Sequence, residues 1–358
     1  MGKSIVPCAL AVVAALGSRP TFGVEGQAAP GAGVGAGETE SLTLLCPQVP
    51  SPPRLDGDLS DGAWQVARPL RVFVHQPCTS SGIGSIVAEL RACWSGENIY
   101  MAVRWPDPSA SLKKDLWTFD GSKWTKDPNE DEDRLALTFP IGQTVPGFRQ
   151  GGCASTCHGS TISPSGVRGK PRWYHRTNGP QERMDSWHWK SVRSNPLDFV
   201  DDKYWDNQTL LADVHHGGRH FDAEPPGQPA EQRNSNKEGT APSYMQDPGK
   251  PPSVPGFLLR DEVVPIDLSR FKKGDVVPGR ITARAGGSRG DISCKGVHRD
   301  GHWNLELCRK LCTGHDDDVV FEPGQSVPFV MAVFENLPEF RKEDHGKVSE
   351  VLTLEILE

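Results

Sequence analysis

Apolar and polar residues alternate in several short stretches, which is the pattern of β-strands with one buried face. Residues 85–95 (SIVAELRACWS) alternate in this way, and residues 98–106 (NIYMAVRWP) follow after a turn at Gly96. Together they predict a β-hairpin. Residues 134–141 (RLALTFPI) predict a further strand after an acidic turn.

The stretch 185–193 (DSWHWKSVR) also predicts a strand, and its two faces differ in chemistry. Trp187 and Trp189 occupy one face, and His188 and Lys190 occupy the other. Because side chains of a strand point to opposite sides in turn, we expect the tryptophans to enter the core.

Residues 206–256 interrupt the β pattern, since they are polar and rich in glycine and proline. We expect a long loop of the kind that covers a functional site. Alternation returns after this loop, and helical periodicity is weak throughout. The later expected strands are residues 276–285, 301–311, 327–335 and 350–358. The chain therefore predicts an all-β fold, a β-sandwich formed by residues 46–358, with long loops.

The N-terminus has the pattern of a secretory signal. A lysine precedes an apolar run from Ile5 to Leu16, which is too short to span a bilayer. We expect residues 1–23 to be a signal peptide that takes Cys8 with it, and residues 24–45 to be a flexible tether rich in glycine and alanine. No later segment is apolar enough to span a membrane, so the sequence predicts a periplasmic or otherwise exported protein.

Composition narrows the functional class. The 358 residues have a formal net charge of -7 and no run of lysine and arginine, which argues against nucleic-acid binding. The 38 glycines and 31 prolines favour turns over helices, in agreement with the β pattern. The sequence contains no nucleophile-elbow motif and no phosphate-binding glycine loop, so it predicts no catalytic site.

The most distinctive chemistry lies in residues 151–160 (GGCASTCHGS), where Cys153, Cys157 and His158 are close together. Covalent haem attachment uses two thiols and an adjacent histidine that binds the iron. The usual haem motif has two residues between the cysteines, whereas this chain has three. A disulfide or half of a zinc site is the alternative, although a zinc site needs further ligands.

The remaining cysteines can form three disulfides, which export permits. Outside the motif and the signal they are Cys46, Cys78, Cys93, Cys294, Cys308 and Cys312. The last two repeat the motif spacing without its histidine, because Thr313 follows them. We expect Cys308 and Cys312 to be bonded to each other.

Several segments, in order along residues 46–358, resemble the haem-binding domain of the ethylbenzene dehydrogenase and dimethyl sulfide dehydrogenase gamma subunits, in its c-type cytochrome branch. The most specific matches are GCASTCH and WHWK. The matching segments are residues 54–67, 98–109, 132–141, 152–158, 185–193 and 301–335.

The resemblance implies a β-sandwich similar to the carbohydrate-binding modules of family nine, with one haem at an end of the sandwich. It implies that Cys153 and Cys157 bind haem c covalently and that His158 is the proximal iron ligand. The chain would then be no enzyme itself but a mono-haem cytochrome. It would exchange electrons with a molybdenum oxidoreductase of the dimethyl sulfoxide reductase type, as a gamma-like subunit or soluble partner.

The implied partners are the catalytic and iron–sulfur subunits of that enzyme, or another cytochrome. Two rival functions stay open. One is a carbohydrate-binding module that uses exposed tryptophans and has no redox role. The other is a haem sensor or a structural subunit.

The ligand on the distal side of the iron is left open. Relatives with non-covalent haem use a methionine and a lysine, which points to Lys190, whereas the His188 imidazole is already largely neutral at pH 7. Met184, Met245 and His75 are further candidates. Without the resemblance, His188 and Lys190 would be assigned to a solvated strand face.

Three weaker patterns involve clusters of possible metal ligands. His215, His216 and His220 can bind a transition metal, but a surface cluster or a cover for the haem edge is the stronger interpretation. Residues 129–133 (NEDED) and 316–318 (DDD) can bind calcium or a basic partner, but we expect both to be solvated turns.

Overall fold

The computed structural model describes residues 42–75, 85–127, 131–142, 144–162, 168–208, 218–250, 256–335 and 347–358. The expected signal peptide and most of the expected tether lie outside the described residues, as do Cys78, His215 and His216. The side chains of residues 157–174 also lie outside them, although most of their backbone is described.

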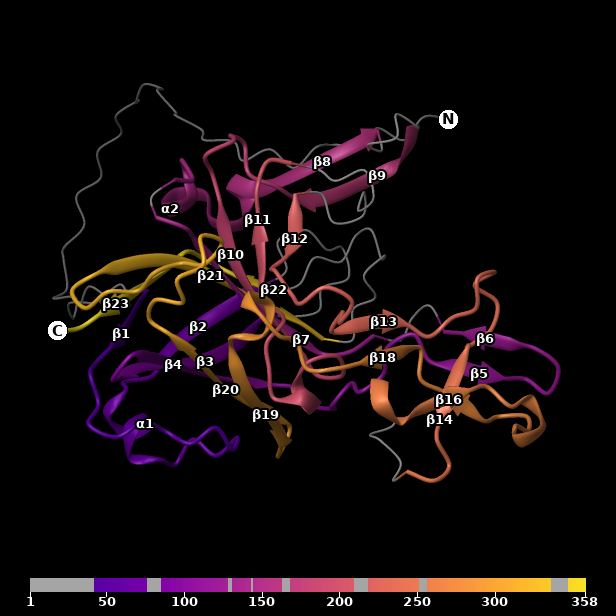
Figure 1. Ribbon diagram of the computed structural model, residues 1–358. Helices are drawn as coiled ribbons and strands as arrows, with labels where there is room; N and C mark the ends of the chain where they lie inside the picture. Colours follow the sequence, from indigo (N-terminus) through magenta and orange to yellow (C-terminus); the bar gives the residue numbers. More distant parts are fainter. Residues whose placement is uncertain are drawn as a thin grey trace, which may run out of the picture. The chain divides into compact units, whose positions relative to one another are not determined.

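Most strands belong to one sheet of thirteen strands (Figure 1). In spatial order they are β12 (Arg219–Phe221), β11 (Lys203–Trp205), β10 (Met184–Lys190), β7 (Arg134–Pro140), β21 (Ser326–Phe334), β22 (Lys347–Ser349), β2 (Leu70–His75), β3 (Ile86–Ser95), β4 (Asn98–Pro106), β20 (His302–Lys310) and β19 (Ser293–Arg299). To one side of this order, β1 (Thr43–Cys46) pairs in parallel with β23 (Leu352–Ile356), which also pairs with β21.

The sheet curls so that its two parts face each other across one hydrophobic core. Leu90, Met101 and Leu307 enter this core from β3, β4 and β20, and Phe139 and Trp187 enter it from β7 and β10. The short strand β22 joins the two parts between β21 and β2. The predicted all-β fold is confirmed, as a curled and mainly antiparallel sheet with few helices.

Most of the predicted strands form where the alternation places them. The predicted hairpin is β3–β4, with Ser95 paired to Asn98 next to the turn. The other predicted strands of the main sheet correspond to β7, β10, β20, β21 and β23. The prediction for residues 276–285 is only partly met, because they form two short strands, β17 (Val276–Val277) and β18 (Arg280–Thr282), outside the main sheet.

The predicted long loop, residues 206–256, contains short strands in the parts that the structure describes. Besides β12 they are β13 (Glu231–Arg233) and β14 (Tyr244–Gln246). In two small three-stranded sheets, β18 lies between β13 and β15 (Leu258–Leu259), and β5 (Trp117–Phe119) lies between β17 and β6 (Trp124–Lys126). Two small two-stranded sheets are formed by β14 with β16 (Val263–Pro265) and by β8 (Cys157–Ile162) with β9 (Arg168–His175). Short segments of this kind lack the length for a clear alternation, so composition alone marks them as a loop.

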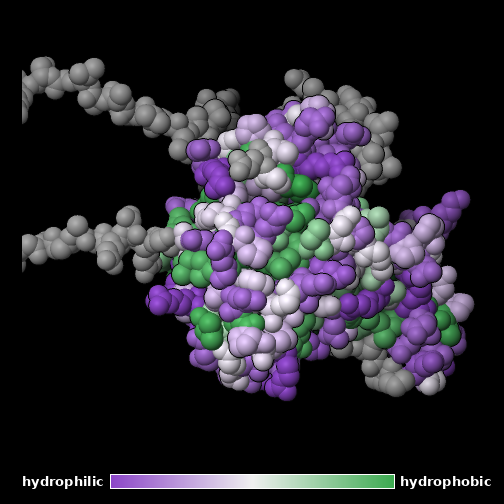
Figure 2. Space-filling model, turned by 60° about the vertical axis from the view of Figure 1, so that its left-hand side comes forward, coloured by the Kyte–Doolittle hydropathy of each residue, from purple (hydrophilic) through white to green (hydrophobic). Residues whose placement is uncertain are grey.

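The helices that the structure describes are short. They are α1 (Gly62–Val66), α2 (Phe148–Gly151) and the 3-10 helices η1 (Gly152–Thr156), η2 (Asn195–Leu197), η4 (Arg260–Glu262), η5 (Leu268–Arg270) and η6 (Ser288–Gly290). Within the described ranges, no helix is long and apolar enough to cross a membrane. On the face shown in Figure 2, hydrophobic side chains form small patches between hydrophilic ones.

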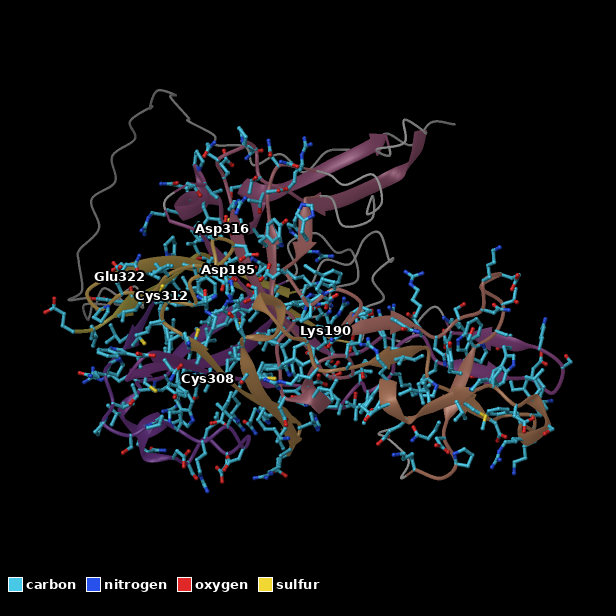
Figure 3. The ribbon with its side chains drawn as sticks, in the orientation of Figure 1. Asp185, Lys190, Cys308, Cys312, Asp316 and Glu322 are labelled. Atoms are coloured by element: carbon cyan, nitrogen blue, oxygen red, sulfur yellow. The ribbon has the colours of Figure 1, made fainter. Side chains whose placement is uncertain are left out.

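The expected disulfide between Cys308 and Cys312 is wrong, because both are free thiols. Cys308 lies in β20 beside Tyr100, whereas Cys312 is exposed beyond the end of the strand (Figure 3). Strand β20 continues past Cys308 to Lys310, so the chain is extended as it leaves Cys308 and carries Cys312 away from it. The structure also has no disulfide at the other cysteines with described side chains, which are Cys46, Cys93, Cys153 and Cys294.

Candidate functional site

Strand β10 separates the core from a second buried layer. Trp187 and Trp189 point into the core, as predicted, with exposures of 1% and 0%. Met184, His188 and Lys190 lie on the opposite side of β10, which we call the outer face. The alternative of a solvated strand face is wrong, because His188 is only 6% exposed and Lys190 only 1%. Chain segments that follow β10 in the sequence cover this face.

The cysteine motif lies at the start of the β8–β9 hairpin. Cys153 is in η1, and the backbone of Cys157 pairs with His175 at the end of β9. The Cys153 Sγ atom is 3.2 Å from His175 Nε2. The His175 ring stacks on Trp205 of β11, with ring centroids 4.4 Å apart. These contacts hold the base of the hairpin against the main sheet.

Cys153 packs on the outer face of the sheet. It joins a hydrophobic cluster that includes Met184 of β10 and Val330 of β21. The backbone at Gly152 also comes close to the sheet, since a Cβ atom there would lie 3.0 Å from Val330 Cγ1. Gly152 has a φ of 51°, so glycine suits both the close approach and the backbone conformation.

The register of the sheet relates this cluster to His188. Val330 pairs with Thr138, which pairs with Ser186. His188 follows Ser186 by two residues on the same face of β10, a step of about 7 Å along a strand. Met184, the other member of the cluster on β10, precedes His188 by four residues, so the cluster that Cys153 joins lies about one to two rows of side chains from His188.

His188 offers an unpaired nitrogen on this face. Its Nε2 atom is buried and has no hydrogen-bond partner among the described residues, and its ring lies 6.0 Å from the ring of Phe334. Burial, followed by the charges of Lys203 and Lys190, lowers the pKa of His188 well below its usual value. The imidazole is therefore neutral at pH 7 and has a lone pair available for a metal.

The residues beside His188 in the sheet are small. Its partner across β7 is Ala136, and Ala332 of β21 follows in the same row. Both alanines are half-buried. The row continues through Val348 to His75, whose side chain is exposed. Residues paired in this way share one face of the sheet, so His188 and His75 lie at opposite ends of one row.

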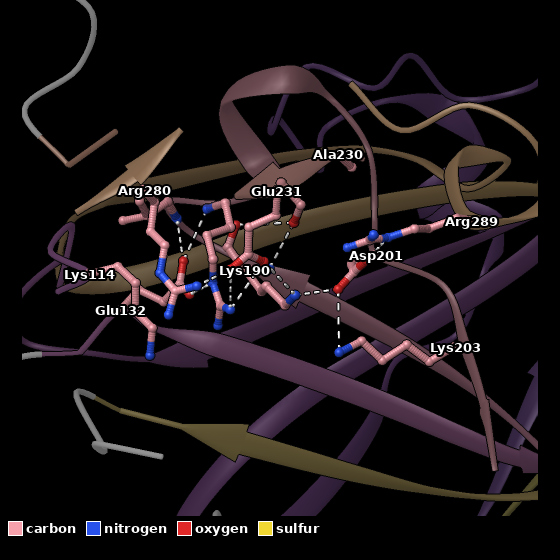
Figure 4. Close-up of polar contacts among 12 residues, drawn as sticks. Lys114, Glu132, Lys190, Asp201, Lys203, Ala230, Glu231, Arg280 and Arg289 are labelled. Atoms are coloured by element: carbon pink, nitrogen blue, oxygen red, sulfur yellow. Dashed lines mark hydrogen bonds and ion pairs between the residues drawn. The ribbon is translucent and has the colours of Figure 1, made fainter. Parts of the chain in front are cut away.

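Lys190 belongs to a network of buried ion pairs (Figure 4). Its Nζ atom contacts Asp201 and lies 3.8 Å from Glu231. Asp201 also binds Arg289, with 2.6 Å between Nε and Oδ1, and Lys203 at 3.4 Å. Burial alone would raise the pKa of Asp201, but these cations lower it well below its usual value. In this structure, carboxylates therefore engage Lys190.

The described part of the acidic stretch 129–133 is buried rather than solvated. Asp131 binds Lys114 at 2.8 Å, and Glu132 accepts a hydrogen bond from Arg193. Both carboxylates are at most 1% exposed. The basic partners come from distant parts of the chain, which a reading of the local charge pattern cannot anticipate.

The two candidate methionines lie in different sheets. Met184 is fully buried in the cluster that contains Cys153. Met245 lies in β14, where it pairs with Val264 of β16, and its sulfur accepts a hydrogen bond from the Asp267 backbone. Met184 is thus the methionine that the fold brings to the cysteine motif.

His220, the described member of the predicted histidine cluster, lies in β12. Its Nε2 atom is 2.9 Å from Asp206 Oδ1 and 3.1 Å from the Gln208 carbonyl oxygen. The ring also lies 5.0 Å from Tyr204. These partners and its 8% exposure indicate a structural role in packing the end of the sheet rather than a solvated surface cluster.

Comparison with known families identifies the chain. The model of the ethylbenzene dehydrogenase family matches residues 61–345, which is more than half of the chain. The chain belongs to the ethylbenzene dehydrogenase family. Membership ties this family member to an oxidoreductase complex. No curated protein matches its sequence.

Two solved structures similar to this family member come from Caldicellulosiruptor kristjanssonii. A carbohydrate-binding module of family 9 in complex with glucose matches with 7% identity and a TM-score of 0.35, over 87% of this chain and 95% of that chain. The module in complex with cellotriose matches with 8% identity and a TM-score of 0.33, over 88% and 95%.

The structure adds one residue to the predicted site of this family member. His175 contacts Cys153 and is the pairing partner of Cys157, but it stands far from the motif in the sequence. An alternating pattern at residues 168–175 would have been the only signal, and RGKPRWYH does not alternate clearly.

Proposed function

We propose that this chain is an exported mono-haem c-type cytochrome. It would transfer electrons to or from a molybdenum oxidoreductase of the dimethyl sulfoxide reductase type, as a gamma-like subunit or a soluble partner. Membership of the ethylbenzene dehydrogenase family supports this role. Within the chain, the observation that supports it most is the unpaired Nε2 of His188, on the face where Cys153 packs.

The residues present fit a covalently bound haem. Cys153 and Cys157 would form the two thioether bonds, and His158 would be the proximal ligand. The buried His188 nitrogen has no competing hydrogen bond and belongs to a neutral imidazole. A haem in this position would supply an iron that takes up and releases one electron. The chain would set the potential through ligand identity and burial.

We propose His188 as the distal ligand. Lys190, which the family resemblance favours, is engaged by Asp201 and Glu231. Lys190 would have to leave these carboxylates buried without their partner before it could bind iron, which is costly. Met184 is the second candidate, because it contacts the same cluster as Cys153.

The carbohydrate-binding alternative depends on exposed tryptophans. None of the tryptophan side chains that the structure describes is exposed. The half-buried Trp94 donates its indole N–H to the Leu357 carbonyl oxygen and packs against the core. The described surface therefore offers this alternative no aromatic platform.

Haem attachment is tested by producing the full chain in a host that matures c-type cytochromes, followed by extraction with acidified acetone and intact-mass measurement. We expect one haem to stay bound to the wild-type chain. The double variant Cys153→Ser and Cys157→Ser should lose it. The control Cys312→Ser, an exposed thiol of the second C-x3-C pair, should retain it. Covalent haem in the double variant would refute the proposed attachment.

The distal ligand is tested by the absorption and electron paramagnetic resonance spectra of the oxidised protein. His188→Ala should convert a low-spin spectrum to a high-spin one. The control His302→Ala should leave the spectrum unchanged, because this histidine lies at the surface, with its Nδ1 atom 2.9 Å from the Asp300 carbonyl oxygen. An unchanged spectrum in His188→Ala would exclude His188 and direct the test to Met184→Ala.

A further inference from the structure

A second cluster of buried charge consists almost entirely of carboxylates. Asp185 of β10, Asp202 between β10 and β11, and Asp318 between β20 and β21 have carboxylate oxygens within 4.8 Å of one another. Asp222, which follows β12, forms a second such group with Asp317 and Asp318. Distant parts of the chain thus converge on one acidic centre, close to the position of Asp185 in Figure 3.

Five buried oxygens of this cluster lack hydrogen-bond partners among the described residues. Asp222 is 2% exposed, and neither of its carboxylate oxygens has a partner among the described residues. The same is true of one oxygen each of Asp185, Asp202 and Asp318, which are at most 2% exposed. Proteins rarely leave buried polar atoms unpaired, because desolvation is costly. These unpaired oxygens are therefore available to a cation.

Arg309 offsets only part of the negative charge. Its Nη1 atom is 2.7 Å from Asp185 Oδ2 and 3.9 Å from Asp318 Oδ1, and its guanidinium packs 4.8 Å from the Trp187 ring. Arg309 thus serves the side of the cluster that contains Asp185. Arg309 reaches the group that contains Asp222 through Asp318, at the longer distance of 3.9 Å.

The surroundings of Asp222 are acidic. Burial raises its pKa to about 10, and the next contributions come from Asp317, Asp185 and Asp318. The other two carboxylates of the group have few balancing partners. Thr313 donates a hydrogen bond to Asp318, the Ser288 hydroxyl lies 3.4 Å from Asp317, and the exposed His315 is close to Asp317. Hydroxyl groups and one histidine do not balance the carboxylates, so a cation is the expected ligand.

The geometry matches an oxygen-binding divalent cation. Calcium binds oxygens at 2.3–2.6 Å, so two ligands of one ion lie no more than about 5 Å apart. The 4.8 Å limit within each group satisfies this requirement. Carboxylate ligands favour a hard cation, and ligands from separate irregular segments suit the flexible coordination of Ca²⁺ better than the strict octahedron of Mg²⁺.

We propose that Asp222, Asp317 and Asp318 bind one Ca²⁺ ion, with Asp185 and Asp202 adjoining it. The ion would fasten the loop between β20 and β21 to the end of β12 and stabilise the edge of the curled sheet. This inference goes beyond the electron-transfer role and uses no residue of the cysteine motif. It also gives the acidic stretch 316–318 a function that its local pattern did not favour.

The test uses the full chain after treatment with a chelator and exchange into metal-free buffer. Calorimetric titration with CaCl₂ should show one tightly bound ion, and thermal unfolding should shift upward by several degrees. MgCl₂ should give a smaller shift. Absence of both Ca²⁺ binding and the shift would refute the site, and equal binding of Mg²⁺ would refute the assignment to Ca²⁺.

Two variants separate binding from folding. Asp222→Asn should abolish the Ca²⁺-dependent shift, yet in chelator it should unfold at the same or a higher temperature than the wild type, because it removes a carboxyl group whose burial among acidic neighbours is unfavourable. Asp316→Asn is the matched control, since its side chain is 92% exposed in the same loop and pairs with Arg183 at the surface. Wild-type Ca²⁺ affinity in Asp222→Asn, or its loss in Asp316→Asn, would overturn the proposal.

Discussion

Asp201 and Asp202 are consecutive and both almost completely buried, yet their surroundings are opposite. Asp201 contacts Lys190, Lys203 and Arg289 on the outer face of β10. These cations overcome the effect of burial and hold the pKa of Asp201 well below its usual value. Asp201 is therefore ionised, and its charge is balanced within the chain.

Asp202 points to the other side, where its neighbours are acidic. Burial and then the charges of Asp185 and Asp222 raise its pKa well above the usual value. Since burial is the same for the two residues, the partners decide the outcome. We call the group around Asp201 the complete cluster, because cations of the chain balance its carboxylates. We call the group around Asp202 the acidic cluster, for which we propose a bound cation.

The complete cluster also bears on the candidate haem site. Lys190 and His188 share the outer face of β10, and the carboxylates of Asp201 and Glu231 engage only Lys190. His188 is left neutral and unpaired. The ion pairs thereby distinguish two neighbouring residues between which the sequence leaves the choice of distal ligand open.

The largest expected effect comes from breaking the complete cluster. Asp201→Asn removes the carboxylate shared by three buried cations, and we expect it to lower the free energy of unfolding by about 3–5 kcal/mol. Urea denaturation at pH 7, followed by tryptophan fluorescence, measures this loss. A loss below about 1 kcal/mol would mean that Asp201 does not hold the network together.

The pH dependence of stability distinguishes the two clusters next. Asp202 and Asp222 have raised pKa values in the folded chain, so in chelator the folded state binds more protons than the unfolded state above pH 4. Stability should then fall from pH 5 to pH 7, by about 1 kcal/mol per pH unit for each such group. Asp201, whose pKa is lowered, has the opposite sign, and its contribution is lost only as the pH falls below about 4.

Urea denaturation at pH 5, 6 and 7 checks this dependence, with chelator and with saturating Ca²⁺. Calcium should flatten the slope, because the bound ion keeps the carboxylates ionised. A slope that is flat in chelator would show that the acidic cluster is already balanced within the chain.

A smaller effect of the opposite sign is expected at the neighbouring residue. Asp202→Asn should raise the free energy of unfolding in chelator by about 1 kcal/mol, since it removes a buried carboxylate from a group of like charges. The same substitution one residue earlier is destabilising, which makes the pair an internal control. Destabilisation of Asp202→Asn in chelator would contradict the proposed difference between the clusters.

The smallest change in the free energy of unfolding is expected for an exposed ion pair. Arg183 lies 3.2 Å from Asp316 at the surface, and Arg183→Ala should change the free energy of unfolding by no more than about 0.5 kcal/mol. The same urea denaturation measures it. A change as large as that of Asp201→Asn would show that burial does not account for the difference.

Much of the fold follows from the sequence because long strands leave a clear alternation. The hairpin β3–β4 and the core position of Trp187 and Trp189 follow from period-two patterns alone. Short strands such as β12 and β13 lack that length, and polar composition conceals them. The pairing of Cys308 with Cys312 was wrong because spacing does not reveal that Cys308 lies inside a strand, β20, which continues to Lys310.

The candidate site was predictable only in part. The motif identifies Cys153, Cys157 and His158, since attachment chemistry requires those residues close together. The choice between His188 and Lys190 depends on two carboxylates that bind Lys190. Asp201 follows Lys190 by eleven residues, and Glu231 lies farther along the chain. Such long-range electrostatics leaves no local pattern in the sequence.

Haem content is the most direct measurement for the proposed function. The pyridine haemochrome spectrum of the purified full chain, compared with its protein concentration, gives both the type and the number of haems. We predict the bands of haem c and one haem per chain. A correctly exported chain that is colourless, or whose haem is extracted as free haem b, would contradict the assignment of this family member as a c-type cytochrome.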